Sequence, residues 1–185
     1  MGTIRHPQPA KLFFGMLSSD PSLFDACARI LVTEYGPVDL ESEILPWNIT
    51  NYYREELGDR ILRKFIFLER LIDPSELPRT KIFTNNVEST FATREIRGLH
   101  RRINLDPGYL TQAKVVLATT KDFAHRIYIG DGIYAEATLR YSSPDRGFVP
   151  FDHTYPDYRT EQYTAIFNKA RENLRSALKR NGKID

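Results

Sequence analysis

The chain has 185 residues, a formal net charge of +2 and 41% hydrophobic residues, which is ordinary for one globular domain. No stretch approaches the roughly 20 apolar residues that a membrane-spanning helix requires, and the charge is weaker than in dedicated nucleic-acid binders. The polar residues 1–10 lack the apolar segment of a signal peptide, and Cys27 has no partner for an internal disulfide. We therefore expect a single-domain cytoplasmic protein with no membrane contact, in which residues 1–10 form a flexible N-terminal segment.

The first seventy residues predict a strand, a helix and two more strands. Lys11–Leu17 is a short apolar run typical of a buried strand. A helix should begin after Asp20, with Pro21 at its first position, and Gly36 lies just past its expected end. Two further strands are predicted at Val38–Leu45 and Ile61–Leu71, separated by the polar segment Asn48–Arg60, a loop or a short helix.

The middle of the chain carries a second helix and a turn signal. Asp73 and Glu76 have the spacing of a capping box, and apolar residues at helical spacing continue to Phe91. A short strand is predicted at Ile103–Leu105, followed by a type II turn at Asp106–Tyr109, where proline and glycine occupy suitable positions. Residues 111–120 fit either a helix or a strand.

The last third predicts a β-hairpin and a long helix. His125–Ile129 and Ile133–Tyr141 flank Gly130-Asp131-Gly132, which is a hairpin signal. Ser142–Arg159 has the composition of a loop, and an amphipathic helix begins near Thr160. The predicted fold is α+β, a mainly antiparallel sheet with helices packed on it. The order of the first elements fits a ferredoxin-like core, to which the hairpin and the C-terminal helix are added.

The hairpin is the first candidate site. By the two-residue period of a strand, one face of its second strand carries polar side chains and the other apolar ones. The polar face holds Tyr134, Glu136, Thr138 and Arg140, and the apolar face holds Ile133, Ala135, Ala137 and Leu139. Arg126 and Arg140 could bind an anion, with Glu136 as a base or a metal contact. The alternative is a solvated sheet face with cross-strand ion pairs.

Other residues near the hairpin extend this candidate site. His125 is the best general acid or base, and Lys114 could contact a phosphate. The segment Thr154–Arg159 could close a pocket, or it could fix the last helix on the sheet. No phosphate-binding glycine loop is present, and the histidines show no metal-binding spacing. The candidate catalytic residues are Glu136 and His125, and the candidate ligand-binding residues are Arg126, Arg140, Tyr134, Lys114, Tyr155, Asp157 and Arg159.

Basic residues form a separate candidate surface. One cluster contains Arg94, Arg97, His100, Arg101 and Arg102. The last helix adds Lys169, Arg171, Arg175, Lys179 and Arg180. Basic residues beside aromatic rings can bind single-stranded nucleic acid. The alternative is an ordinary charged helix face and loop.

Three segments, KLFFGMLSSDPSLF, LDPGYLTQAKVVLATTKDFAHRIYIGDGIYAEATLRY and TYPDYRTEQY, together resemble one prokaryotic family, the domain of unknown function 4416. The resemblance extends from about Lys11 to the last helix. It implies no established activity, substrate, cofactor or catalytic residue. Two hypotheses about function follow from the residues. The first is a site for a phosphorylated or nucleotide-like small molecule, which could be an enzyme, and the second is a non-catalytic module that binds RNA or an acidic protein.

Overall fold

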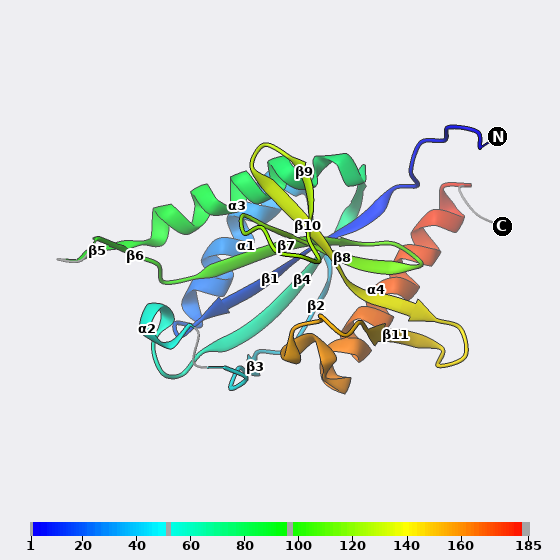
Figure 1. Ribbon diagram of the computed structural model, residues 1–185. Coiled ribbons are helices and arrows are strands. Elements are labelled where there is room, and N and C mark those ends of the chain that lie inside the picture. Colours follow the sequence, from blue (N-terminus) through cyan, green and yellow to red (C-terminus); the bar gives the residue numbers. More distant parts are fainter. Residues whose placement is uncertain (1, 51–52, 96–97, 183–185) are drawn as a thin grey trace.

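The computed structural model describes residues 2–50, 53–95 and 98–182 (Figure 1). Residues 2–9 have no regular secondary structure, and Ala10 already belongs to the first strand. No helix among the described residues has the length and apolar character needed to cross a membrane. The first half of the chain contains β1 (Ala10–Ser18), α1 (Ser22–Tyr35), β2 (Val38–Glu41), β3 (Leu45–Pro46), α2 (Arg54–Leu57), β4 (Leu62–Ile72), the 3-10 helix η1 (Pro74–Glu76) and α3 (Leu77–Phe91). The second half contains β5 (Thr93–Glu95), β6 (Gly98–His100), β7 (Asn104–Leu110), β8 (Lys114–Thr119), β9 (Ile127–Gly130), β10 (Ile133–Ser142), β11 (Gly147–Pro150), the 3-10 helix η2 (Pro156–Arg159) and α4 (Glu161–Arg180).

The sheet confirms the predicted α+β class. Its strand order is β11-β10-β8-β7-β1-β4-β2, with β3 paired to β4 and β9 paired to β10, and all of these pairs are antiparallel. The segment β7-β1-β4-β2, with α1 and α3 as connections, has the arrangement of a ferredoxin-like split βαβ unit. The strands β8 to β11 extend this unit at the β7 edge. In Figure 1, α1 and α3 lie on one side of the sheet and α4 on the other.

Most of the predicted helix ends are confirmed, because they depend on local chemistry. Helix α1 begins at Ser22, one residue later than predicted, with Pro21 at the N-cap position, although the Asp20 carboxylate accepts a hydrogen bond from the Ser22 amide at 3.0 Å. Gly36 ends α1 with a φ of 95°. Asp73 and Glu76 form the predicted capping box. Thr160 caps α4 by accepting a hydrogen bond from the Tyr163 amide. The hairpin turn also forms as predicted, with Asp131 and Gly132 in the left-handed region.

The turn predicted at Asp106–Tyr109 is wrong, because strand β7 runs straight through it. Strand β1 pairs with β7 from Lys11–Leu110 to Leu17–Asn104, so long-range pairing overrides the turn signal. Gly108 serves close packing instead: a Cβ there would clash with the Val116 carbonyl oxygen and the Phe13 ring. The ambiguous segment 111–120 is mostly strand β8, the predicted strand Val38–Leu45 divides into β2 and β3, and the loop predicted at Ser142–Arg159 contains β11 and η2.

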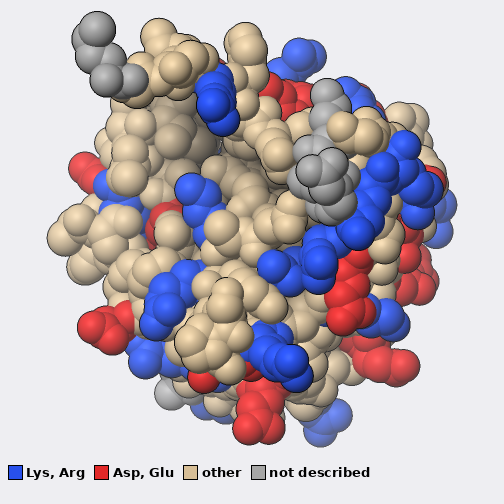
Figure 2. All heavy atoms as spheres, turned by 90° about the vertical axis from the view of Figure 1, so that its right-hand side faces the viewer, with Lys and Arg blue, Asp and Glu red and all other residues tan. Residues whose placement is uncertain are grey.

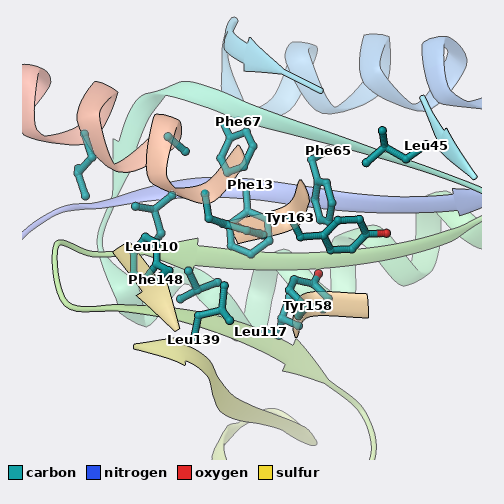
Figure 3. Close-up of a cluster of buried hydrophobic side chains, with 14 of the residues drawn as sticks. Phe13, Leu45, Phe65, Phe67, Leu110, Leu117, Leu139, Phe148, Tyr158 and Tyr163 are labelled. Carbon is teal, nitrogen blue, oxygen red and sulfur yellow. The ribbon is translucent and has the colours of Figure 1, made fainter. Parts of the chain in front are cut away.

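Each face of the sheet has its own hydrophobic core. On one face, α1 and α3 cover side chains such as Leu12, Phe14 and Ile66. On the other face, α4 covers an aromatic cluster to which β1 contributes Phe13 and β4 contributes Phe65 (Figure 3). This cluster also contains Phe67, Tyr158, Tyr163 and Phe167, with several edge-to-face ring pairs whose centroids are 4.9–5.6 Å apart.

A β-bulge in β10 corrects the predicted faces of the hairpin. The pairing with β8 shifts between Ala137 and Leu139, so that Thr138 is the extra residue. The strict two-residue alternation therefore fails after Ala137, and Leu139 joins the aromatic cluster beneath α4. Arg140 consequently does not share a face with Glu136, and the predicted stripe of four polar side chains ends at the bulge.

Candidate functional site

A cavity of about 330 Å³ opens where strands β7 and β8 part from one another. The two strands pair only from Gly108–Leu117 to Leu110–Val115. Asp106 lies beyond the paired part of β7 and Thr119 beyond that of β8, and both line the cavity. Pro107, which has no amide proton to donate, occupies the position at which the pairing stops. The other lining residues come from the β3–α2 segment, β4, α3, the β6–β7 connection, the start of β7, β8, the β8–β9 connection, β10, and η2 with the residue before it. They include Trp47, Tyr53, Arg63, Lys81, Asn85, Arg101, Asn104, Lys121, Arg126, Glu136, Tyr155, Asp157 and Tyr158.

Arg63 is the most deeply buried charge in the cavity wall. Its guanidinium donates to the Asp157 carboxylate at 3.0 Å and to the Asp106 carboxylate at 3.2 Å. Although burial opposes a charge here, the oxygens of Tyr158, Asp157 and other neighbours raise the pKa of Arg63 above its usual value. The same Asp157 oxygen accepts a hydrogen bond from the Trp47 indole at 3.2 Å. Strand β4, η2 and the β3–α2 segment are thus joined at one carboxylate.

A second group of charges surrounds Arg101 on the α3 side of the cavity. The Arg101 guanidinium forms a two-pronged ion pair with the Glu56 carboxylate, with Nη2–Oε2 at 2.7 Å. Its Nη1 atom donates to Glu88 at 2.9 Å and to the Asn104 side chain at 3.2 Å. The hydrogen bonds to Glu56 raise the pKa of Arg101, so it remains charged. Lys81 completes the group by donating to the Leu105 carbonyl at 2.7 Å.

The third group contains two of the strongest sequence candidates, Glu136 and Arg126. Glu136 is buried, with 3% of its side chain exposed, and accepts from Arg126 Nε at 2.9 Å and His125 Nε2 at 3.2 Å. Its other oxygen accepts from the Thr138 hydroxyl at 3.3 Å. Arg126 also donates to the Tyr155 hydroxyl at 3.3 Å, which links the hairpin to the segment before α4.

Three buried polar side-chain atoms in the described part of the chain have no hydrogen-bond partner, and all three belong to cavity-lining residues. They are Arg63 Nε, Asn104 Nδ2 and the Tyr158 hydroxyl. Each buried polar atom without a hydrogen bond lowers the free energy of unfolding by about 1–3 kcal/mol relative to the same atom with a partner. Folded proteins keep few of these atoms, and each one needs an explanation. Among the described residues, the side chains that carry such atoms therefore all adjoin this cavity.

The structure brings together four of the nine predicted site residues. Arg126, Glu136, Tyr155 and Asp157 line the cavity, although they come from different segments. His125 contacts Glu136 from outside the lining set, and its ring stacks on His153 at 4.6 Å.

The other four lie elsewhere. Lys114 and Arg140 are exposed and opposite each other in the β8–β10 ladder. Tyr134 packs on Tyr128 with ring centroids 5.4 Å apart. Arg159 donates to the carbonyls of Thr154 and Asp152 and stabilises the loop before α4.

Sequence reasoning missed Arg63 as a site residue. A weak signal existed, since Arg63 interrupts an apolar strand and a buried arginine requires partners. In the sequence, Asp106 belongs to the predicted turn, and Trp47 follows the predicted strand Val38–Leu45. Their shared role could not be read from spacing, because Arg63 and Asp157 are 94 residues apart.

In the first basic cluster, two of the described arginines are paired with acids. Arg101 binds Glu56 and Glu88, and Arg102 binds Asp20 at 2.7 Å. Arg171 packs over the Tyr141 ring, 3.4 Å from its centroid. Arg97 and the side chain of Arg94 lie outside the described residues. Figure 2 shows the side on which α4 ends, where basic side chains lie among acidic and uncharged ones.

The fold and the cavity define an α+β protein with a charged cavity of ligand size beside a ferredoxin-like unit. Within the described residues, no group of three or more His, Cys, Asp or Glu side chains is placed to hold a metal ion. The chain belongs to the family named Domain of unknown function (DUF4416), which matches residues 8–174. No curated protein and no solved structure matches the chain.

Proposed function

We propose that this protein binds a phosphorylated small molecule, such as a nucleotide or a sugar phosphate, in the cavity between β7 and β8. The observation that carries the proposal is an excess of cations over acids among the residues that line a cavity of ligand size, while Glu56 and Glu88 pair with Arg101 from outside that lining. Five lining residues are basic and three are acidic, namely Arg63, Lys81, Arg101, Lys121 and Arg126 against Asp106, Glu136 and Asp157. Arginine and lysine side chains are the usual partners of phosphate groups in proteins.

The volume and the uncharged part of the wall support the same ligand class. Small-molecule sites have volumes of about 300–1,000 Å³, and the cavity lies within that range at about 330 Å³. Trp47, Tyr53 and Tyr155 supply aromatic surface for a sugar or a base, and Thr119 and Thr120 supply hydroxyl groups. A phosphorylated metabolite combines these features, because one end is anionic and the other is flat or polyhydroxylated.

The proposal is restricted to binding, because Glu136 is poorly placed to move a proton. Its two oxygens already accept three hydrogen bonds, and the side chain is buried. These contacts suit a carboxylate that orients Arg126 toward the cavity. We place the protein in the cytoplasm, where such metabolites occur and where an unpaired buried cysteine such as Cys27 is common.

A thermal-shift screen with matched compound pairs tests the proposal. Uridine would be compared with uridine monophosphate, and glucose with glucose 6-phosphate, so that only the phosphate differs. A ligand at about 100 times its Kd adds about 2.7 kcal/mol, which raises the Tm of a protein this size by roughly 5–10 °C. We expect at least one phosphorylated member to shift the Tm and its partner not to. Equal shifts, or none across the panel, would contradict the proposal.

Two lysines on the β8 segment provide a matched pair of variants. Both side chains are exposed, but Lys121, just after β8, lines the cavity, whereas Lys114, at the start of β8, does not. Lys121→Gln therefore removes a charge from the cavity wall, and Lys114→Gln removes a charge outside it. We expect the first to weaken binding about tenfold and the second by less than twofold, as measured by calorimetry. A similar loss in both variants would indicate attraction to the overall charge of the protein.

A further inference from the structure

We infer that the phosphoryl group of the ligand binds to Arg101 and Lys121 at one end of the cavity, in the place that the Glu56 carboxylate now holds. This inference rests on the proposed function and adds the position of the anion to it. Glu56 then acts as a built-in competitor, which a phosphoryl group displaces on binding.

Two of the five lining cations are held by acids that cannot leave them. Arg63 has two carboxylate partners, Asp106 and Asp157, so its immediate surroundings are already negative. Arg126 is paired with Glu136, whose side chain is 3% exposed. Moving that carboxylate away from its partner would leave a buried uncompensated charge, which costs about 3–5 kcal/mol. Neither arginine can exchange its partner for a phosphate.

Lys81 is similarly committed. Its amine donates to the Leu105 carbonyl at 2.7 Å and lies 3.8 Å from Glu88. Glu88 is itself buried and accepts from the Leu105 amide at 2.7 Å. These three groups fix α3 to β7 and have little freedom to rearrange.

Arg101 differs because one of its partners can move into water. The Glu56 side chain is 34% exposed and belongs to α2, a helix of only four residues. It binds Arg101 through both oxygens, which is the two-pronged geometry that arginine also offers to phosphate. Glu88 and Asn104 hold the other side of the guanidinium, so Arg101 would keep its orientation when Glu56 leaves.

The charge of Lys121 also acts on the Glu56 carboxylate. The pKa of Glu56 is lowered first by its hydrogen bond from Arg101 and, against burial, also by the charges of Arg101, Lys121 and His100. Arg101 and Lys121 both line the cavity, and Glu56, just outside that lining, lies within the influence of both charges. The Thr119 and Thr120 hydroxyls line the cavity next to Lys121 in the chain. A phosphoryl group there would replace one carboxylate, and it carries more charge and more acceptor oxygens than that carboxylate.

The test measures the affinity of inorganic phosphate and pyrophosphate by calorimetry, at constant ionic strength, for four forms of the protein. Glu56→Gln removes the competing charge, and we expect pyrophosphate to bind about tenfold more tightly than to the wild type. Asp59→Asn removes an acid from the same segment that is 86% exposed and pairs with Arg54 instead. We expect less than a twofold change for that control.

The fourth form is the double variant Glu56→Gln/Arg101→Met, in which the gain should disappear. Unchanged or weaker binding by Glu56→Gln, with its Tm near that of the wild type, would overturn the inference. So would a gain that survives the loss of Arg101, or the absence of phosphate and pyrophosphate binding in every form. The proposed function is judged separately: a Tm shift by uridine monophosphate together with an unaffected Glu56→Gln would leave the cavity proposal intact and refute only the role of Glu56.

Discussion

Lys11 and Arg63 are buried cations on neighbouring strands, and they differ in how completely they are paired. The side chain of Lys11 is 0% exposed, and its amine donates to Asp39 at 2.6 Å and to the Leu68 carbonyl at 2.9 Å. The side chain of Arg63 is 3% exposed and is bound by two carboxylates, yet its Nε atom has no partner among the described residues. Lys11 lies where β1 is paired on both sides, and Arg63 lies beside the cavity.

This contrast separates a fully paired structural charge from a charge that lines the cavity in which we propose ligand binding. A buried cation is tolerated when it is paired and hydrogen-bonded, because water otherwise solvates it better. Lys11 meets that requirement through one acid and one carbonyl. Arg63 leaves a donor unsatisfied, in company with Asn104 and Tyr158, which is the pattern expected where a protein gives up stability for function.

The largest expected effect is that of Arg63→Met. This change leaves Asp157 buried without its cation, and we expect a loss of about 3–5 kcal/mol in the free energy of unfolding. Urea denaturation measures it. Arg70→Met is the control, because Arg70 is on the same strand but exposed, and its loss should stay below about 1 kcal/mol. Similar losses in the two variants would remove the distinction between a buried and an exposed arginine on β4.

Lys11→Met should cost less, about 2–3 kcal/mol, because Asp39 is partly exposed and can be solvated when its partner is lost. Binding of phosphorylated compounds should change by less than twofold, since Lys11 does not line the cavity. Urea denaturation measures the change in the free energy of unfolding, and calorimetry on the same preparation measures the change in ligand affinity. A variant that keeps its stability but loses ligand affinity would reverse the roles that we assign to the two cations.

Tyr158→Phe removes a hydroxyl that has no hydrogen-bond partner among the described residues, so we expect the free energy of unfolding to rise by no more than about 1 kcal/mol. Ser42→Ala is the comparison. The Ser42 hydroxyl donates to the Glu43 carbonyl and accepts from the Phe65 amide, and losing it should cost about 1–2 kcal/mol. Thermal unfolding of both variants decides the matter. A larger loss of stability in Tyr158→Phe than in Ser42→Ala would mean that the Tyr158 hydroxyl has a hydrogen-bond partner in the folded protein.

The smallest effect concerns the half-buried pair of Glu56 and Arg101, whose side chains are 34% and 33% exposed. Because the folded-state pKa of Glu56 lies below its ordinary value of about 4.5, the pair stabilises the protein above that pH. This contribution is lost as the pH falls through the lowered pKa. We expect wild type to exceed Glu56→Gln by less than about 1 kcal/mol at pH 7, with the difference vanishing in acid. Tm values of both proteins from pH 7 to pH 3 test it, and a difference independent of pH would contradict it.

The candidate site was only partly predictable from the sequence. Glu136, Arg126, Tyr155 and Asp157 were identified because their segments are unusually rich in groups that contact ligands. Arg140 was assigned to the same face by strict alternation, which the bulge at Thr138 breaks. Arg63 and Arg101 find their acidic partners across 94 and 45 residues, and no local pattern encodes such distances.

The sequence by itself determined the elements whose signals are local: the capped helix starts at Asp73 and Thr160, the glycine that ends α1, and the hairpin turn at Asp131-Gly132. These features depend on hydrogen bonds and φ values within a few residues. Only the tertiary structure decided that Pro107 and Gly108 lie inside a strand, that β7 and β8 part beside them, and which charges face the cavity. Those outcomes depend on strand pairing and burial between distant segments, because a charge placed in the interior must find its partner wherever the fold brings one close.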